Sequence, residues 1–328
     1  MKLLDRCRER CRQAPQRIVF PDACDARLLH AANRMVAEGL AQPILIGRPF
    51  ELRDLAHRSG VALPCLTIVD PAASGATAAF AAALQERQRD KGMSEAEALE
   101  LLRQPLYYGA SMVQAGQADL CIAGNLSTTG DVIRAAIRCI GLAPGQKTVS
   151  SFFMMVSPDG SSTRAFSDAG VVPEPDPAQL ADIAIDSAAS FTALTGEPAR
   201  VAMLSFSTHG SSNHPAALRV REACKLVKQR QPTLVVDGEL QFDAAVVPAV
   251  ASQKAPRSPL QGASNVLIFP SLNAGNIGYK VAQRLCNYLA LGPLLQGLNK
   301  PMHDLSRGAS ADDIVDVAVL ASCMKATG

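Results

Sequence analysis

The segment 300–313 carries the densest group of reactive side chains in the chain, with the sequence KPMHDLSRGASADD. Ser306 and Arg307 stand before a glycine in a loop, where a polar pair has no role in a hydrophobic core. An arginine in such a loop can bind an anion through two hydrogen bonds or stabilise an oxyanion. Asp313 could act as a general base, but with Ser310 it also fits a capping box at the start of the apolar helix that follows.

Hydroxyl side chains gather in a second loop, which follows the apolar run 120–124. Ser127, Thr128 and Thr129 precede a helical pattern, and Arg134 lies about one turn further along. The free N–H groups and positive dipole end of a helix favour an anion, and an arginine can add a bidentate contact. The same residues could instead provide a helix N-cap and a surface arginine. The pattern GxxxxGK[ST] of a P-loop is missing.

Two more loops have the same character. They span 206–213 and 270–280 and combine glycine with hydroxyl and amide side chains. Their candidate ligand contacts are Ser207, Thr208, Asn276, Tyr279 and Lys280. Three such loops lining one cleft would suit a ligand with several phosphates, although each of them could equally be an ordinary connecting loop.

The elements that must position these loops alternate along the chain. Short β-branched or apolar runs are followed by Ala- and Leu-rich segments with helical periodicity, which indicates βαβ units and largely parallel sheets. The expected strands are 17–20, 43–46, 66–69, 120–124, 150–156, 201–205, 234–236 and 266–269. The clearest expected helices are 26–38, 178–194 and 278–291. In such folds, ligands bind beyond the carboxyl ends of the strands, which is where the loops described above lie.

Length and composition exclude several classes of protein. The 328 residues are enough for about two domains. Lys and Arg number 32 against 30 Asp and Glu, and a net charge of +2 is too balanced for binding nucleic acid by phosphate neutralisation. No apolar run is long enough to span a membrane and the first residues lack a secretory signal, so we expect a cytoplasmic protein. Its nine cysteines are then reduced, none forms a CxxC, and no metal site is expected.

Five collinear segments resemble phosphate acetyltransferases, and most closely the short form found in bacterial ethanolamine utilisation. The segments are ADLCIAGNLSTTGDVIRA (118–135), VAMLSFSTHGSSNHP (201–215), LVVDGELQFDAA (234–245), NVLIFPSLNAGNIGYKVAQRL (265–285) and GPLLQGLNKPMHDLSRG (292–308). Together they span nearly the whole chain, and the last two are the most diagnostic.

This resemblance implies an α/β fold of two α/β/α domains with largely parallel sheets and an interdomain cleft, as in isocitrate and isopropylmalate dehydrogenases. Domain I would comprise residues 1–145 and 292–328, and domain II residues 146–291. The implied reaction is acetyl-CoA + phosphate ⇌ CoA + acetyl phosphate, with coenzyme A as a substrate and no permanently bound cofactor. Members of the family are commonly homodimers, so a homodimer is expected, with neither nucleic acid nor a membrane as a partner.

The resemblance assigns catalytic roles to Ser306, Arg307 and Asp313. Asp313 would take the proton of the CoA thiol, and burial would make this carboxylate more basic. Arg307 and Ser306 would stabilise the tetrahedral oxyanion, while Arg134 and the three hydroxyls of its loop would hold the phosphate. One anion contact stays open, because either Arg87 or Arg89 could replace an arginine that relatives carry in this stretch.

Three alternatives differ from this function. Transfer of a propionyl or butyryl group needs only a larger acyl pocket, and one methylene changes binding by about 1–3 kcal/mol. A metal- and NAD-dependent dehydrogenase of similar fold would need an acidic metal site, for which the aspartates of 312–316 are a poor substitute, and the chain has no GxGxxG after a strand. A scaffold role would rest on the amphipathic segment 1–14, which either packs on its own domain or docks on a microcompartment shell.

Overall fold

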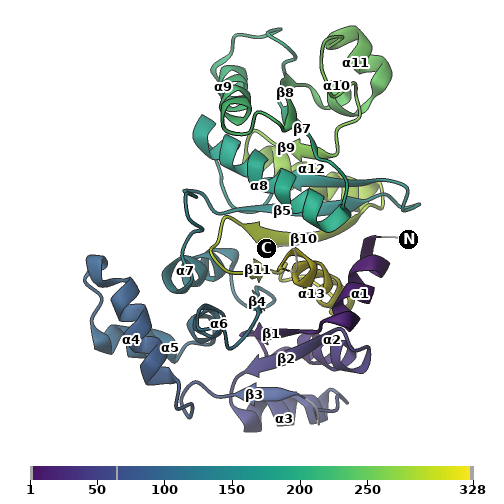
Figure 1. The fold of residues 1–328 in the computed structure, drawn as a ribbon. Coiled ribbons are helices and arrows are strands. Elements are labelled where there is room, and N and C mark those ends of the chain that lie inside the picture. Colours follow the sequence, from purple (N-terminus) through teal and green to yellow (C-terminus); the bar gives the residue numbers. More distant parts are fainter. Residues whose placement is uncertain (1–2, 64–65, 326–328) are drawn as a thin grey trace. The chain divides into compact units, whose positions relative to one another are not determined.

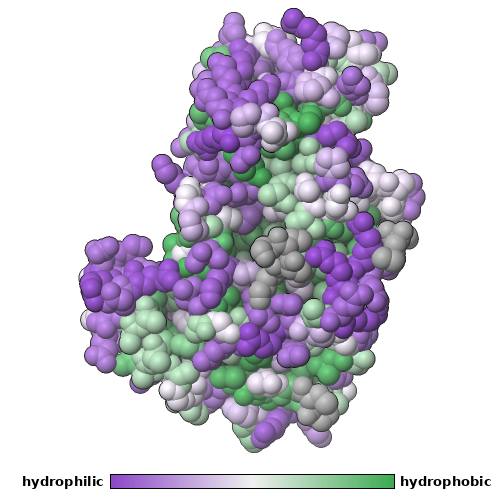
Figure 2. Space-filling model, in the orientation of Figure 1, coloured by the Kyte–Doolittle hydropathy of each residue, from purple (hydrophilic) through white to green (hydrophobic). Residues whose placement is uncertain are grey.

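The computed structural model describes residues 3–63 and 66–325. Of the nine cysteines, Cys65 lies outside the described residues. The chain forms two compact units, Met1–Pro144 with Leu298–Gly328 and Gly145–Gly297 (Figure 1). Each unit is built around one sheet flanked by helices, and the expected α/β class with largely parallel sheets is confirmed. On the face shown in Figure 2, hydrophilic residues dominate and apolar residues gather in separate patches.

The sheet of the first unit is parallel throughout, with the order β11-β4-β1-β2-β3. Its strands are β1 (Gln16–Phe20), β2 (Ala41–Ile46), β3 (Thr67–Val69), β4 (Leu120–Ala123) and β11 (Met302–Asp304). The last strand of the chain therefore pairs with β4, in a register that sets Asp304 beside Ala123. Because all five strands run the same way, their carboxyl ends meet at one edge of the sheet.

Helices cover this sheet, and several begin at the caps that the sequence indicates. They are α1 (Leu3–Gln13), α2 (Ala26–Ala37), α3 (Pro49–Arg58), α4 (Thr77–Arg87), the short 3₁₀ helix η1 (Arg89–Lys91), α5 (Glu95–Leu102), α6 (Pro105–Gln114), α7 (Thr129–Cys139) and α13 (Ala311–Lys325). Ser94 and Glu97 form a capping box at the start of α5. Among the described helices, none has both the length and the apolar character needed to cross a bilayer.

The first helix packs against the last one, as the purple α1 beside the yellow α13 shows in Figure 1. Leu3, Cys7 and Cys11 form the covered face of α1 and are at most 7% exposed. Arg8 of α1 forms an ion pair with Asp316 of α13 at 2.9 Å, so the Asp316 carboxylate faces α1 and not the solvent. The apolar face of α1 is therefore occupied by its own domain and is not presented to a shell protein in this conformation.

The second unit has a mixed sheet with the order β10-β5-β6-β9-β7-β8. Its strands are β5 (Ser150–Val156), β6 (Thr163–Ser167), β7 (Arg200–Leu204), β8 (Val235–Leu240), β9 (Val266–Ile268) and β10 (Leu289–Gln296). The pairs β10–β5 and β5–β6 are antiparallel, and the other three are parallel. The compact second unit reaches Gly297, five residues beyond the expected boundary at 292, because β10 pairs with β5 as far as Gln296.

Five helices flank this second sheet. They are α8 (Pro177–Thr195), α9 (Pro215–Arg230), α10 (Phe242–Val246), α11 (Pro248–Lys254) and α12 (Leu272–Leu285). The expected helix 278–291 is too long at its end, because the chain turns after Leu285 and enters β10 at Leu289. Helix α8 starts in a capping box of Asp176 and Gln179 and is followed by Gly196 in the left-handed conformation.

Helix α8 also carries two carboxyl groups one turn apart, Asp182 and Asp186. Burial and the charge of Asp182 raise the pKa of Asp186 to about 7, although Gln146 donates a hydrogen bond to it at 2.7 Å. Between its ordinary pKa of 3.8 and about 7, Asp186 holds a proton in the folded chain that the unfolded chain has lost. This carboxyl therefore lowers stability as the pH rises through that window.

We expect Asp186→Asn to increase the free energy of unfolding at pH 8 by about 1–2 kcal/mol, allowing for partial exposure of the group. At pH 4 the two proteins should unfold alike, because the wild-type carboxyl is then protonated in the folded state. Urea unfolding at the two pH values tests this. An Asp186→Asn variant that is no more stable than the wild type at pH 8 would contradict it.

Candidate active site

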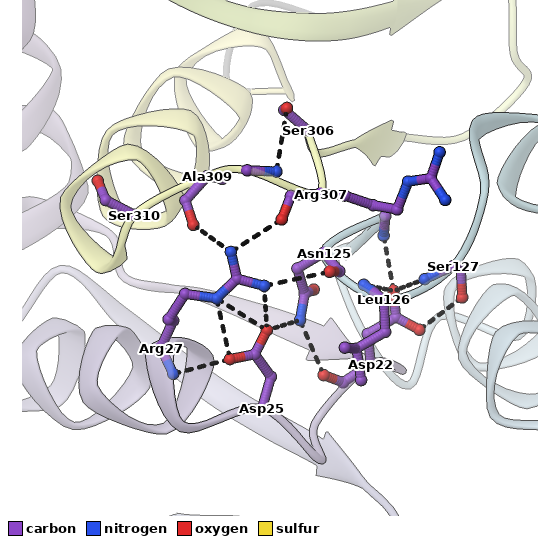
Figure 3. A network of polar contacts seen from close by, with 12 residues as sticks. Asp22, Asp25, Arg27, Asn125, Leu126, Ser127, Ser306, Arg307, Ala309 and Ser310 are labelled. Atoms are coloured by element: carbon purple, nitrogen blue, oxygen red, sulfur yellow. Dashed lines mark hydrogen bonds and ion pairs between the residues drawn. The ribbon is translucent and has the colours of Figure 1, made fainter.

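Three loops meet at the carboxyl edge of the first sheet, because they follow the adjacent strands β1, β4 and β11 (Figure 3). They span 21–25, 124–128 and 305–310. The structure thereby brings together two groups that the sequence analysis found separately, the hydroxyls after β4 and the Ser306–Arg307 pair after β11. A cavity of about 440 Å³ lies beside the loop after β1 and is lined by residues that include Asp22 and Leu126, but by none of 305–310.

The carboxylate of Asp22 organises the loop after β4. It accepts hydrogen bonds from the backbone N–H groups of Gly124 (2.8 Å), Leu126 (3.2 Å) and Ser127 (3.0 Å), and from the Ser127 hydroxyl (2.6 Å) (Figure 3). The backbone N–H groups of this loop therefore point at an anion that belongs to the chain itself. They are not open to a substrate anion in this structure.

The other hydroxyls of this loop also have carboxylate partners. Thr128 is the N-cap of α7 and donates to Asp131 at 2.8 Å, while Thr129 donates to Asp304 at 2.6 Å. A hydroxyl has one proton to donate, and in all three residues it is used within the chain. That Ser127, Thr128 and Thr129 hold the phosphate stays a prediction, for which their protons would have to leave these partners. Arg134 is 54% exposed and pairs with Asp131 on the surface of α7.

Arg27, at the start of α2, connects all three loops. Its guanidinium donates to the backbone carbonyls of Arg307 (2.9 Å), Ala309 (2.8 Å) and Asn125 (3.2 Å). It also forms an ion pair with Asp25 at 2.6 Å (Figure 3). Burial opposes the charge of Asp25, but hydrogen bonds from Arg27 and Asn125 outweigh it and lower the pKa of this carboxyl. Arg27 thus clamps the loop after β11 onto the loop after β4.

The sequence analysis missed Asp22, Asp25 and Arg27. They lie in the segment PDACDAR, which directly follows the first strand. The rule that ligands bind beyond the carboxyl ends of strands applies to this segment as well. The position of this segment after a strand is therefore the sequence signal for these three residues.

Ser306 and Arg307 are both exposed at the tip of the loop after β11. The main chain of Arg307 is held by Arg27, whereas its guanidinium makes no hydrogen bond or ion pair with the described residues, and no dashed line reaches it in Figure 3. The Ser306 hydroxyl accepts a weak hydrogen bond from the Gly308 N–H at 3.3 Å. The loop is thus fixed, while the cationic end of Arg307 stays available to an anion.

Asp313 has the partner expected for a helix cap. Its Oδ2 accepts from the N–H and the hydroxyl of Ser310, both at 2.8 Å, and the Ser310 hydroxyl accepts from the Asp313 N–H at 3.1 Å. The capping box is therefore confirmed. Asp313 is half-buried rather than buried, so the structure shows the cap directly and leaves its role as a base a prediction.

Asp304, at the end of β11, is a fourth site residue that the sequence did not single out. It is 1% exposed, and its Oδ2 accepts from Thr129 at 2.6 Å. Burial raises its pKa to about 6, against the opposing effect of the Thr129 hydrogen bond. Its Oδ1 lies against Gly124, where a Cβ atom would come within 2.2 Å and where the backbone φ is +111°. Only glycine fits there.

The predicted contacts Ser207 and Thr208 are internal to the second unit. Ser207 is fully buried and donates to Glu239 at 2.8 Å, and Thr208 accepts from the Gln241 N–H at 3.0 Å. Burial opposes the charge of Glu239, but Arg221 and further donors lower its pKa to about 2. Ser207 and Thr208 therefore hold their own loop together and offer no free hydroxyl to a ligand here.

The three candidates on α12 have different surroundings. Asn276 donates to the Ala169 carbonyl at 3.1 Å, and the ring of Tyr279 stacks on Phe153 with 4.0 Å between centroids. Lys280 is exposed. All three belong to the second unit, so their contact with substrate stays a prediction.

The two arginines left open by the sequence differ in their contacts. Arg87 donates to the Ile140 carbonyl at 3.0 Å and so ties α4 to the end of α7. Arg89 pairs with Glu86 on the surface. Neither lines the 440 Å³ cavity.

Comparisons with known proteins agree over the whole chain. A family model described as "Phosphate acetyl/butaryl transferase" matches residues 2–322. The phosphate acetyltransferase of Acetivibrio thermocellus is 43% identical over 324 residues, which cover 98% of this chain and 97% of that protein. The structure of "EutD phosphotransacetylase from Staphylococcus aureus" matches with a TM-score of 0.90 at 39% identity, covering 98% of both chains. A phosphotransacetylase from Streptococcus pyogenes matches with a TM-score of 0.94 at 38% identity, covering 99% of this chain and 98% of that one.

Proposed function

The chain belongs to the phosphate acetyl/butyryl transferase family, and we propose that it is an acyltransferase that interconverts acetyl-CoA and phosphate with CoA and acetyl phosphate. The observation that carries this proposal is the loop of Arg307. Its main chain is fixed by Arg27 while its guanidinium is free for an anion, at the edge of a parallel sheet where ligands bind. Coenzyme A enters as a substrate.

The reaction follows from a direct attack. The CoA thiol gives up its proton to Asp313, and the thiolate adds to the acetyl carbonyl carbon of acetyl phosphate. The resulting tetrahedral oxyanion is stabilised by the Arg307 guanidinium and the Ser306 hydroxyl. The C–O bond to phosphate then breaks, which releases inorganic phosphate and leaves acetyl-CoA.

Cationic side chains supply the contacts to phosphate in this proposal. The hydroxyls of Ser127, Thr128 and Thr129 are engaged with carboxylates and serve to shape the loop. Arg134 and Arg307 are exposed and carry the forked donors that match a phosphate. In this proposal the two arginines alone contact the phosphate, whereas the sequence suggested that the three hydroxyls contact it too.

The activity is tested with purified protein, CoA and acetyl phosphate, and thioester formation is followed by its ultraviolet absorbance. We expect acetyl-CoA to form, with propionyl and butyryl phosphate as poorer substrates. The names of the relatives at about 43% identity favour the acetyl group. A higher kcat/KM with butyryl phosphate would assign the chain to the butyryl branch instead, and no thioester from any of the three would contradict the proposal.

The homodimer is proposed from helix α12. Of its 14 residues only Gly275 is buried, and Ile277 (62% exposed), Val281 (47%) and Leu285 (78%) form an apolar stripe at a spacing of four residues. A helix with such a face normally packs against something, and a second copy of the chain is the expected partner.

We expect Leu285→Asp to halve the mass measured by sedimentation equilibrium, because it places a charge in the most exposed position of that apolar stripe. Phe50→Asp is the matched control, since Phe50 is 82% exposed in the first unit, outside the stripe. A wild-type protein that sediments as a monomer, or a variant that stays dimeric, would contradict this interface.

The enzyme is proposed to work in the cytoplasm, and its match to a EutD phosphotransacetylase agrees with the resemblance to short enzymes of ethanolamine utilisation. A microcompartment is the alternative location. Attachment to its shell would need a surface other than the apolar face of α1, because Leu3, Cys7 and Cys11 are covered by α13.

A further inference from the structure

We propose that Asp304 is a positioning residue for acyl transfer, which locks the first turn of α7 to the loop that carries Arg307. The inference rests on the proposed function and extends it to a residue that does not itself touch the substrate. Asp304 ends β11, and Arg307 follows three residues later. Whatever fixes Asp304 therefore also fixes the start of this loop.

The lock is a short hydrogen bond between two elements that are distant in sequence. The Thr129 hydroxyl donates to Asp304 Oδ2 at 2.6 Å, and the two residues are 175 positions apart. Thr129 is the first residue of α7, the helix that also carries Arg134. The bond thus joins the two elements from which the proposed phosphate contacts, Arg134 and Arg307, project.

The loop after β11 is held at both ends. Arg27 binds the carbonyls of Arg307 and Ala309 from the side of α2, and Asp304 binds Thr129 from the side of α7. With both contacts in place, the backbone of this loop keeps one register relative to α7. Two cationic groups that grip one phosphate need such a fixed spacing, since a displacement of about 1 Å can reduce the rate strongly.

The surroundings of Asp304 indicate that packing alone does not explain a carboxyl group at this position. A carboxyl that is 1% exposed destabilises the fold unless its partners compensate. Its neighbour must be Gly124, because a Cβ there would overlap Asp304 Oδ1, and the carboxylate of Asp22 binds the N–H of the same glycine at 2.8 Å. An apolar residue in place of Asp304 would fill the space without these constraints.

The test is Thr129→Val, which keeps the shape of the side chain and removes the donor. We expect the KM for acetyl phosphate to rise about tenfold and kcat to fall by about tenfold to hundredfold, while the KM for CoA changes less than about twofold. Thr129→Ser, which restores a hydroxyl, should recover most of the wild-type KM. Asp304→Asn, alone or combined with Thr129→Val, should change KM and kcat no more than Thr129→Val alone, because the two substitutions disrupt the same hydrogen bond.

Thr148→Val is the matched control. It removes a similar bond, from Thr148 to Asp182 at 3.0 Å in the second unit, and should lower stability without changing either KM. A loss of folded protein lowers the measured rate but leaves KM unchanged. If Thr129→Val changes only stability, as Thr148→Val does, Asp304 is a structural residue and the inference is overturned. A wild-type chain without activity would instead refute the proposed function.

Discussion

Replacing Arg307 by alanine is expected to reduce kcat for acetyl-CoA formation by about 10²-fold or more, the loss that follows removal of one donor to an oxyanion. The guanidinium is exposed and has no partner among the described residues, so its removal leaves no buried charge behind and the fold should be unaffected. Turnover is measured with acetyl phosphate and CoA, and unfolding is measured alongside. Arg307→Lys keeps the charge but loses the fork, and should recover only part of the rate.

The matched control is Arg53→Ala, because Arg53 is also an exposed arginine of the first unit but lies on α3, outside the three loops. It should behave like the wild type in both measurements. Near-wild-type turnover of Arg307→Ala would remove Arg307 from the mechanism, since a group that stabilises the transition state cannot be dispensable.

Arg27→Ala is expected to have the largest effect on stability and to lower activity as well. It strips the donor from three backbone carbonyls and leaves Asp25, whose side chain is 6% exposed, without its ion partner. We expect the free energy of unfolding to fall by about 2–4 kcal/mol, and turnover to fall because the Arg307 loop loses its anchor. Urea unfolding at pH 7 measures the first effect, and the thioester assay measures the second.

The pH dependence gives this prediction a second readout. The pKa of Asp25 is lowered in the folded chain, so its contribution to stability is present above its ordinary value of 3.8 and is lost as the pH falls through the lowered one. The difference between wild type and Arg27→Ala should therefore shrink at pH 3. Arg17→Ala, which breaks a partly exposed pair with Asp119, serves as the control and should cost about 1 kcal/mol. Equal losses from the two variants would argue against a clamp.

Features set by neighbouring residues could be predicted from the sequence. The alternation of strands and helices, the capping boxes at Ser94 and Ser310, and the loops after β4 and β11 all depend on residues close together in the chain. Short-range rules describe such features well, because the interacting groups lie within one turn or one strand of each other.

The hydrogen-bond partners of the site could not be predicted in this way. Ser127 and Thr129 read as free donors in the sequence, but their acceptors, Asp22 and Asp304, lie 105 and 175 positions away. Only the pairing of β11 and β1 with β4 brings them into contact. The end of α12 was predicted too late for a related reason. The apolar residues after Leu285 fit helical periodicity, but they form strand β10, which pairs with β5.

The place of β11 and α13 in the first sheet has a consequence for how the protein is made. The second unit is one continuous stretch and can fold as soon as it leaves the ribosome, whereas the first unit lacks an edge strand and the partner of α1 until β11 and α13 have been made. During that interval β4 has an open edge, which could pair with the wrong strand, and the apolar face of α1 is uncovered. The newborn chain thus depends on the segment from β11 to α13 both for protection against aggregation and for the arrival of its reactive loop.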